Sequence, residues 1–214
     1  MFVDDLEEPA LTEVDEAHFR RVLRMKADDL LNVSDGKGSW RPAKLAADGL
    51  ALEPVGEVCR VDPPAASITV AFAPTKGDRP EWTVQKLTEL GVSRIVPVRT
   101  ERSVVTWPPK RADRQRERWR KIGREAAMQS RRTRLPEIDA MVDLVNLVEM
   151  ASPVFLCAPG GDRLEPQDAT FVVGPEGGFA PSELSRVKTV DLGVDTILRT
   201  ETAAVVAATL ALSR

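Results

Sequence analysis

The sequence is poor in the residues that metal, redox and triad chemistry need. It has a single histidine, His18, which excludes a His-rich metal site and leaves a Ser-His-Asp triad one candidate. Its two cysteines, Cys59 and Cys157, lack C-x-x-C spacing, so we expect two buried free thiols and no bound metal. The motif GxxxxGK followed by Ser or Thr is absent, as is GxGxxG, which excludes a phosphate loop and a dinucleotide fingerprint.

Long apolar runs are also absent. The longest mostly apolar stretch, Ala203 to Leu212, is too short to span a bilayer. The first ten residues, MFVDDLEEPA, are acidic and lack the basic region and apolar core of a signal peptide. We therefore expect a cytoplasmic protein with no membrane partner.

Composition and charge distribution indicate a globular chain with a polyanionic partner. Hydrophobic residues make up 43% and charged residues 29% of the 214 positions, an ordinary globular composition with room for two unequal domains. The net charge is −3, but residues 102–134 hold twelve Lys or Arg against three acids. One such run is more often a solvated helix face, whereas two on an acidic chain favour a polyanion. The second cluster consists of Arg20, Arg21, Arg24 and Lys26.

The rhythm of the sequence changes near residue 64. A short helix is expected over residues 15–25, and turn signals such as DGKG and ADG then separate short strand-like runs, which predicts a small barrel or sandwich. These runs are 30–33, 39–45, 50–54 and 57–61. The sequence Asp62-Pro63-Pro64 marks the boundary, so we expect domains over residues 1–64 and 65–214.

After this boundary, strands alternate with helices, which predicts an α/β domain with a mainly parallel sheet covered by helices. The expected strands are 68–73, 95–98, 154–157, 170–173 and 189–192. The expected helices are 79–90, 110–130, 141–150, 181–188 and 201–212. Gly91 is expected to close the first of these helices.

The segment VVGPEGGF, residues 172–179, is the most informative part of the chain. An apolar strand ends in a glycine-rich turn that leads to a helix, which places free backbone N–H groups at the carboxyl edge of a sheet. Ligands of α/β proteins bind at that edge. In isolation, a tight turn that needs positive φ is about as good an explanation as a ligand site.

Two further segments combine polar residues with strand ends. In DLGVDTILRTETAAVVAA, residues 191–208, Thr200 is a candidate helix N-cap and Glu201 lies near the positive end of the helix dipole, although a capped core helix also fits. In the segment 75–98, Lys76-Gly77-Asp78-Arg79 follows a strand. The helix after it is expected to bury Val84, Leu87 and Leu90 and to expose Gln85, Lys86 and Glu89.

In this order, the segments resemble the RsmE family of 16S rRNA methyltransferases in the SPOUT superfamily. The matching stretches are HFRRVLRM, KGDRPEWTVQKLTELGV, REAAMQSRR, VGPEGGF and LGVDTILRTETA. The resemblance implies a PUA-like or OB-like N-terminal β-barrel that binds RNA, a SPOUT domain with a deep trefoil knot, and an obligate homodimer. It also implies methylation by S-adenosylmethionine (SAM) of N3 of one uridine of 16S rRNA, position 1498 in the usual bacterial numbering.

The resemblance assigns residues to the cofactor, to RNA and to chemistry. The expected cofactor contacts are Leu156, Cys157, Gly174, Pro175, Glu176, Gly177, Gly178, Leu192, Gly193, Leu198, Arg199, Thr200, Thr202 and Ala203. The expected RNA contacts are Arg20, Arg21, Arg24, Lys76, Arg79, Arg124, Gln129, Arg131 and Arg132. Arg199 is the candidate for stabilising negative charge on the uracil, and Glu201 for orienting the cofactor or accepting a proton. Met128 stands where relatives usually have Glu, which weakens a catalytic role at that position.

Two alternatives remain open from the sequence. One is an RNA-binding protein that has lost methyl transfer, although the glycine-rich and RTETA segments count against it. The other is a SPOUT-superfamily enzyme that methylates another RNA or a ribose hydroxyl.

Overall fold

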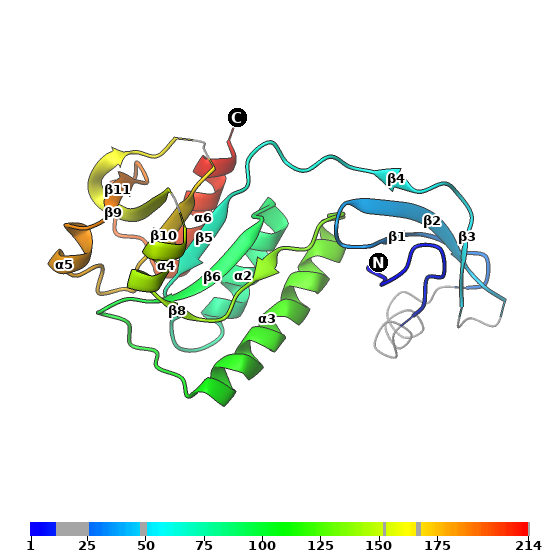
Figure 1. The fold of residues 1–214 in the computed structure, drawn as a ribbon, viewed down its shortest axis with the longest axis horizontal. Helices are drawn as coiled ribbons and strands as arrows, with labels where there is room; N and C mark the ends of the chain where they lie inside the picture. The colour runs from blue at the N-terminus through cyan, green and yellow to red at the C-terminus, as the bar shows by residue number, and fades with distance from the viewer. Residues whose placement is uncertain (12–25, 48–50, 152, 166–167, 214) are drawn as a thin grey trace. The chain divides into compact units, whose positions relative to one another are not determined.

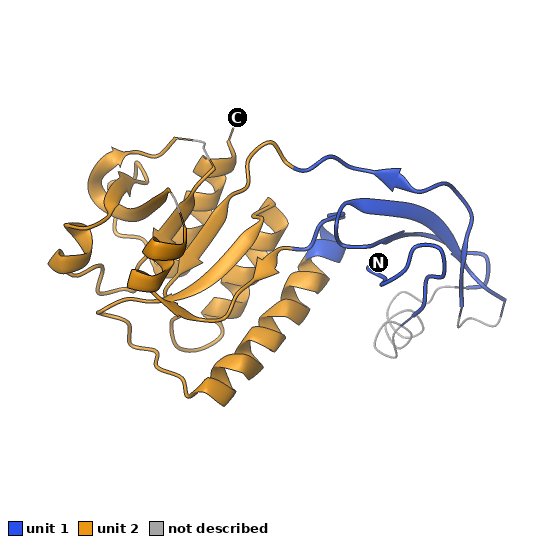
Figure 2. Cartoon of the chain, viewed as in Figure 1, with its two compact units in different colours: residues 1–63, 127–135 blue, residues 64–126, 136–214 orange. Residues whose placement is uncertain are grey.

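The computed structural model describes residues 1–11, 26–47, 51–151, 153–165 and 168–213. The chain divides into two compact units, one of residues 1–63 with 127–135 and one of residues 64–126 with 136–214 (Figure 2). The helix expected over residues 15–25 lies outside the described residues. Within the described part, no helix is long and apolar enough to cross a membrane.

The first unit is built on an antiparallel sheet in which β2 pairs with each of the other strands. Its strands are β1 (Leu30–Ser34), β2 (Ser39–Leu45), β3 (Leu52–Pro54) and β4 (Cys59–Arg60). The DGKG turn joins β1 to β2, and the Asp35 carboxylate accepts the backbone N–H groups of Lys37 (2.7 Å) and Ser39 (3.0 Å). Among the described residues of this unit, the apolar core contains Val3, Val33, Ala43, Leu45 and Leu52.

Residues 127–135 cluster with the first unit, although the sequence analysis placed them in the second domain. The reason is hydrogen bonding with the DGKG turn. The Gly38 N–H donates to the Thr133 carbonyl oxygen at 3.0 Å, and the Leu135 N–H donates to the Gly36 carbonyl oxygen at 2.9 Å. The Arg134 guanidinium adds a bond to the Val61 carbonyl oxygen at 2.9 Å. These long-range bonds cannot be inferred from local sequence patterns.

The second unit contains a sheet in the order β11-β9-β10-β5-β6-β7, with β8 also paired to β6, and every pair is parallel (Figure 1). Its strands are β5 (Thr69–Phe72), β6 (Arg94–Arg99), β7 (Glu137–Ile138), β8 (Val142–Asp143), β9 (Val154–Arg163), β10 (Thr170–Val173) and β11 (Lys188–Asp191). The parallel sheet predicted from the sequence is confirmed.

Helices cover both faces of this sheet, which explains why its central strands are almost wholly apolar. The helices are α2 (Arg79–Leu90), α3 (Pro109–Gln129), α4 (Leu144–Met150), α5 (Pro181–Leu184) and α6 (Thr200–Leu212). Phe72 and Phe171 pack with α2, α3 and α6, while Ala71 and Val172 pack on the opposite face with α4. Trp119 of α3 is fully buried and contacts Phe72 and Trp107.

Several expected elements differ from the observed ones. The helix expected over 141–150 begins at Leu144, because the two residues before it pair with β6. The helix expected over 181–188 ends at Leu184, since Lys188 already begins β11. The helix over 79–90 and its closure by Gly91, with φ of 102°, are confirmed, but Leu90 is 39% exposed and is not a core residue. Cys59, expected to be buried, is exposed.

Candidate active site

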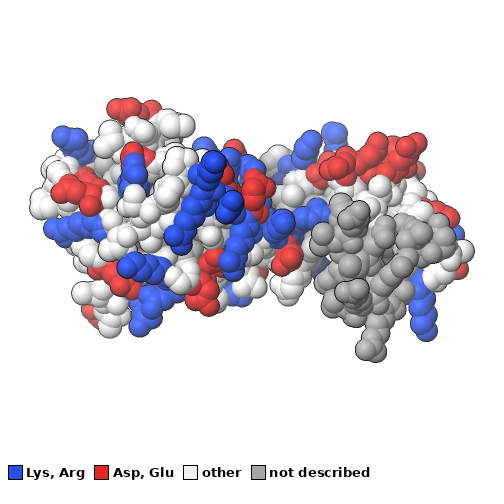
Figure 3. Space-filling model, turned by 90° about the horizontal axis from the view of Figure 1, so that it is seen from below, with Lys and Arg blue, Asp and Glu red and all other residues white. Residues whose placement is uncertain are grey.

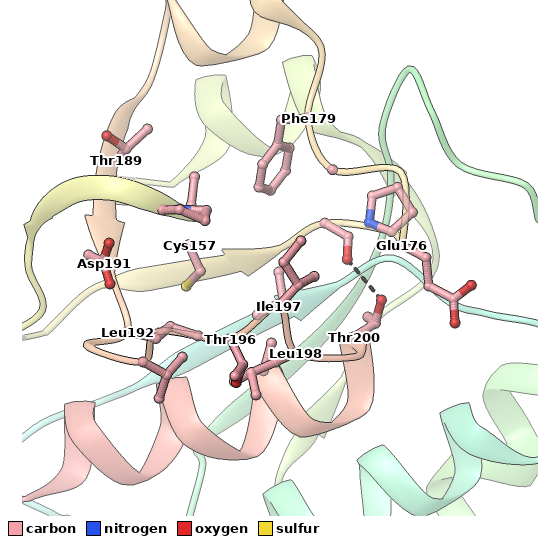
Figure 4. A pocket seen from close by; sticks show the side chains of 18 of the residues that line it. Cys157, Glu176, Phe179, Thr189, Asp191, Leu192, Thr196, Ile197, Leu198 and Thr200 are labelled. Carbon is pink, nitrogen blue, oxygen red and sulfur yellow. Dashed lines mark hydrogen bonds between the residues drawn. The ribbon is translucent and has the colours of Figure 1, made fainter.

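A cavity of about 470 Å³ lies in the second unit, among the middle of β9, the turn after β10, and β11 with the loop that follows it (Figure 4). Its volume is in the range of small-molecule sites. The cavity is lined by residues of the 157–159 stretch, the glycine-rich turn after β10, and the loop that leads into α6. These residues are Cys157, Ala158, Pro159, Val173, Gly174, Pro175, Glu176, Gly178, Phe179, Leu184, Thr189, Asp191, Leu192, Val194, Thr196, Ile197, Leu198, Thr200 and Ala203.

The glycine-rich turn owes its shape to Gly174 and Gly178. Gly178 has a φ of 67°, a conformation that side-chain-bearing residues rarely adopt, and its N–H donates to the Pro175 carbonyl oxygen at 2.8 Å. A Cβ on Gly174 would lie 3.1 Å from the Phe179 ring. Gly177 is different, because it does not line the cavity and a Cβ there would meet only Arg102 at 3.7 Å. Gly174 and Gly178 therefore both shape the tight turn and line the cavity, so the two explanations offered by the sequence are compatible.

Thr200 ties α6 to this turn. The sequence predicted Thr200 as the N-cap of α6, but the N-cap is Arg199 and Thr200 is the first helical residue. Its hydroxyl donates to the Gly174 carbonyl oxygen at 3.0 Å and does not accept a helix N–H as an N-cap hydroxyl would (Figure 4). A buried hydroxyl needs a partner, and the turn supplies it.

The wall formed by β9 and β11 depends on an irregular register. The pairing shifts between Thr189 and Val190, and Gly161 allows the backbones to approach, because a Cβ there would lie 2.6 Å from the Thr189 carbonyl carbon. The Asp191 carboxylate accepts the N–H groups of Gly193 and Gly160, each at 2.7 Å. These bonds, first that of Gly193 and then that of Gly160, lower the pKa of Asp191. Asp191 thus joins two of the segments that surround the cavity.

Cys157 contributes a neutral thiol to the cavity wall. Burial raises its pKa to about 12, so the side chain acts as a small apolar group and not as a nucleophile.

A chain of charged groups lies beside the cavity. The Arg79 guanidinium is 2.9 Å from a Glu176 carboxylate oxygen and 3.6 Å from Oε1 of Glu201. The Glu176 carboxylate points outward from the cavity (Figure 4). The Glu201 side chain is 14% exposed, and its Oε2 is buried with no hydrogen-bond partner among the described residues. An arginine therefore links the glycine-rich turn to the first turn of α6.

Comparison with known proteins identifies the family. The RNA methyltransferase domain family matches residues 62–212, and the RNA methyltransferase PUA domain family matches residues 17–50. A Mycobacterium tuberculosis protein named ribosomal RNA small subunit methyltransferase E is 32% identical over 220 residues, which cover 92% of this chain and 84% of that one. The chain belongs to the ribosomal RNA small subunit methyltransferase E (RsmE) family.

Two solved structures resemble the chain over nearly its whole length. An RsmE from Neisseria gonorrhoeae bound to SAM has a TM-score of 0.85 at 27% identity, covering 98% of this chain and 94% of that one. A protein from Legionella pneumophila, described as a methyltransferase in complex with SAM, has a TM-score of 0.87 at 27% identity, covering 99% and 95%. The SPOUT-type parallel sheet with a PUA-like domain is confirmed, and the trefoil knot stays a prediction.

Most of the expected cofactor contacts of this RsmE protein surround the cavity, but some do not. Nine of the fourteen line it, namely Cys157, Gly174, Pro175, Glu176, Gly178, Leu192, Leu198, Thr200 and Ala203. Leu156 is fully buried in the core, and Arg199 and Thr202 are exposed outside the cavity lining, which also lacks Gly177 and Gly193. Phe179, Leu184, Thr189 and Asp191 were not expected. Phe179 and Asp191 lie inside segments that the sequence analysis singled out, whereas Leu184 and Thr189 do not.

The expected RNA contacts are scattered. Arg20, Arg21 and Arg24 lie outside the described residues. Lys76, Gln129 and Arg131 are exposed, Arg124 and Arg132 are half-buried, and Arg79 is engaged in the ion pairs described above. Burial lowers the pKa of the Arg132 guanidinium.

Several arginines of α3 form hydrogen bonds or ion pairs within this RsmE chain. Arg116 donates to the Ile138 carbonyl oxygen at 3.0 Å, Arg118 lies 3.4 Å from Glu81, and Arg120 lies 2.7 Å from Glu117. Figure 3, seen from the side on which α3 lies in Figure 1, shows basic side chains interleaved with acidic ones. Charge on this helix is therefore a weaker signal for RNA than the sequence suggested.

Proposed function

We propose that this protein transfers the methyl group of SAM to N3 of one uridine of 16S rRNA, position 1498 in the usual bacterial numbering, within the small ribosomal subunit. The observation that carries the proposal is the cavity of about 470 Å³ at the glycine-rich turn, in a chain of the RsmE family. A family member with this fold binds SAM.

The residues around the cavity fit SAM. Leu192, Leu198 and Ala203 offer apolar walls to an adenine ring, and the turn from Gly174 to Gly178 offers backbone N–H and carbonyl groups to its polar edge. When bound, SAM supplies a methyl group on a positively charged sulfur, which is open to attack by a nitrogen. The chain's own contribution is to hold the two reactants in line, and such positioning accounts for much of the acceleration in enzymes of this kind.

Glu201 is our candidate for accepting the N3 proton or orienting the cofactor. Uracil N3–H is weakly acidic, so the proton must leave as the nitrogen attacks. The free Oε2 of Glu201 can accept a hydrogen bond or a proton, while Oε1 lies beside the Arg79 guanidinium. We assign stabilisation of negative charge on the uracil oxygens to Arg199, which precedes the cavity residue Thr200.

We further propose that the lysine and arginines expected to contact RNA bind the rRNA phosphates. We also propose that the first unit is an RNA-binding domain. Reversal of Arg132, which is half-buried, would disturb packing, so exposed Arg131 is the better test. Arg131→Glu should weaken binding to small subunits about tenfold, with a shallower salt dependence and unchanged SAM affinity. Glu8→Gln, an exposed change in the same unit, is the control. Unchanged binding and salt dependence would remove Arg131 from the RNA path.

Two properties of the family are also proposed for this chain, the trefoil knot and a homodimer. Val205, Val206, Leu210 and Leu212 of α6 are only half-buried in the single chain, whereas the alanines on the other side of the helix are buried. A helix that is apolar on most sides leaves surface for a second copy. Sedimentation at micromolar concentration should give a dimer, and a monomer would contradict the proposal.

The decisive experiment is nucleoside mass spectrometry of 16S rRNA from a deletion strain. We expect one 3-methyluridine to be lost, to return with the wild-type gene, and to return only weakly with Glu201→Gln. Loss of a different methylated nucleoside would identify another RNA target. An unchanged nucleoside profile, with retained binding to small subunits, would favour the RNA-binding protein without methyl transfer.

A further inference from the structure

The segment between β10 and α5, which forms one wall of the 470 Å³ cavity, has no regular secondary structure, but hydrogen bonds fix it to neighbouring loops. Residues 174–180 form neither helix nor strand. A second cavity of about 570 Å³ also borders α5 and is lined partly by Ser182, Glu183 and Val187. Pro175, Phe179 and Ala180 are buried at the two ends of the segment, whereas Glu176 and Gly177 in its middle are exposed, so the position of the middle depends largely on hydrogen bonds.

Glu183 makes the central contact by bridging two loops. Its Oε2 accepts the Ala180 N–H at 2.8 Å, and its Oε1 accepts the Glu101 N–H at 2.9 Å. The Ser182 hydroxyl adds a bond to the Glu101 carboxylate at 2.9 Å. The loop after β6 and the end of the cavity wall are thus joined through one carboxylate, and hydrogen bonds to a charged acceptor are the stronger kind.

Arg102, in the same loop after β6, makes the second contact. Its Nη1 donates to the Gly177 carbonyl oxygen at 2.9 Å. Thr100 and Ser103 close this loop on itself, because the Thr100 N–H donates to the Ser103 hydroxyl at 2.9 Å and the Ser103 N–H returns to the Thr100 carbonyl oxygen at 3.1 Å. These two hydrogen bonds restrict the conformation of the loop that carries Arg102, and so help to fix the position of its guanidinium group.

We propose that Arg102 and Glu183 are positioning residues that hold the glycine-rich turn in its ligand-ready shape. Neither residue lines the cavity, so both act through the turn. A binding loop held in place before the ligand arrives loses less conformational entropy on binding. The inference rests on the proposed function, in which this turn binds SAM.

The test uses the full chain, with SAM as the probe. Arg102→Ala and Glu183→Gln should each speed hydrogen exchange of residues 174–180 in the free protein and weaken SAM binding about tenfold, as expected for loss of a charge-assisted bond. With small subunits as substrate, KM for SAM should rise while kcat at saturating SAM changes less than about twofold. Arg102→Lys, which keeps a donor, should recover most of the affinity.

Arg186→Ala is the matched control, since Arg186 is an exposed arginine after α5 for which no side-chain hydrogen bond or ion pair to the turn is seen among the described residues. Exchange and SAM affinity should stay at wild-type values in this variant. Unchanged exchange of residues 174–180 in Arg102→Ala and Glu183→Gln would overturn the inference. The exchange measurement needs no cofactor, so a wild-type protein that fails to bind SAM would contradict the proposed function separately.

Discussion

The two units of this RsmE protein are stabilised in different ways. Among the described residues, the apolar core of the second unit contains eighteen residues on one side of its sheet, including Trp119 and Phe171, and eight on the other. Among the described residues, the apolar core of the first unit contains five aliphatic side chains, Phe2 is buried as well, and residues 127–135 add hydrogen bonds to the DGKG turn. A unit with a large apolar core is stable without contributions from its strand-end loops, so these loops can bind a ligand. A unit with a small core depends more on hydrogen bonds in its turns for stability. The predictions below test this contrast, beginning with the largest effect.

Thiol labelling should separate the units most sharply, because Cys59 in the first unit is exposed and Cys157 in the second is not. With a pKa of about 12, only about one Cys157 thiol in ten thousand is ionised at pH 8. An aromatic disulfide reagent should therefore modify one thiol per native chain quickly, and the second at least about a thousandfold more slowly. Cys59→Ser should abolish the fast phase. A fast phase that persists in that variant would show that Cys157 is accessible.

Core truncation should cost more in the second unit than in the first. Trp119→Ala removes a fully buried side chain packed against Phe72 and Trp107, and should lower the free energy of unfolding by about 3–5 kcal/mol. Leu45→Ala, in the small core, should cost about 2 kcal/mol, since a thin core collapses more easily around a cavity. Urea titration followed separately by Trp fluorescence and far-UV circular dichroism measures both. Equal costs would contradict the contrast between the units.

The glycine-rich turn allows a matched pair of substitutions. Gly178→Ala places a side chain at a φ of 67°, which costs about 1–2 kcal/mol and should weaken SAM binding about tenfold. Gly177→Ala introduces only an ordinary contact with Arg102 outside the cavity lining, so binding should stay within about twofold of wild type. Calorimetric titration of SAM into both variants makes the comparison. A larger loss for Gly177→Ala would mean that the turn changes shape on binding.

The smallest expected effect concerns Asp191 and pH. Hydrogen bonds from Gly193 and Gly160 lower its pKa below the ordinary value of 3.8. Its contribution to stability is therefore complete above that value and is lost as pH falls through the lowered pKa. The difference in free energy of unfolding between wild type and Asp191→Asn should be constant near neutral pH and shrink in the acid range. A difference that grows with acidification would contradict the role of the carboxylate.

The sequence was sufficient to predict those elements whose signals lie within a few neighbouring residues. The apolar runs at Ile68–Ala73 and Thr170–Val173 had to be buried strands, and Gly91 had to end α2, because each signal is contained within a few residues. The glycine-rich turn was located for the same reason. Asp191 and Glu183 were missed, since their roles arise from the register of β11 against β9 and from a loop some eighty residues away.

The same distinction explains why some expected cofactor contacts do not line the cavity. Leu156 and Gly193 adjoin cavity residues in sequence, but a strand alternates its faces, so Leu156 packs into the core while its neighbour Cys157 lines the cavity. The sequence predicted residues 127–135 as part of the second domain, whereas they cluster with the first unit. The hydrogen bonds responsible reach a turn about 97 residues earlier, such as that between Arg134 and Lys37, and leave no trace in local sequence.

The first unit is assembled from two pieces of chain, residues 1–63 and 127–135, with the sheet strands β5 and β6 encoded between them. No single cut of the gene can therefore release either unit intact. A fragment that starts at residue 64 would keep residues 127–135 without the rest of the first unit, so Thr133 and Leu135 would lose their backbone hydrogen bonds to Gly38 and Gly36. During synthesis, too, the small unit waits for more than sixty further residues before its last piece leaves the ribosome, so its completion is tied to production of the first part of the catalytic sheet.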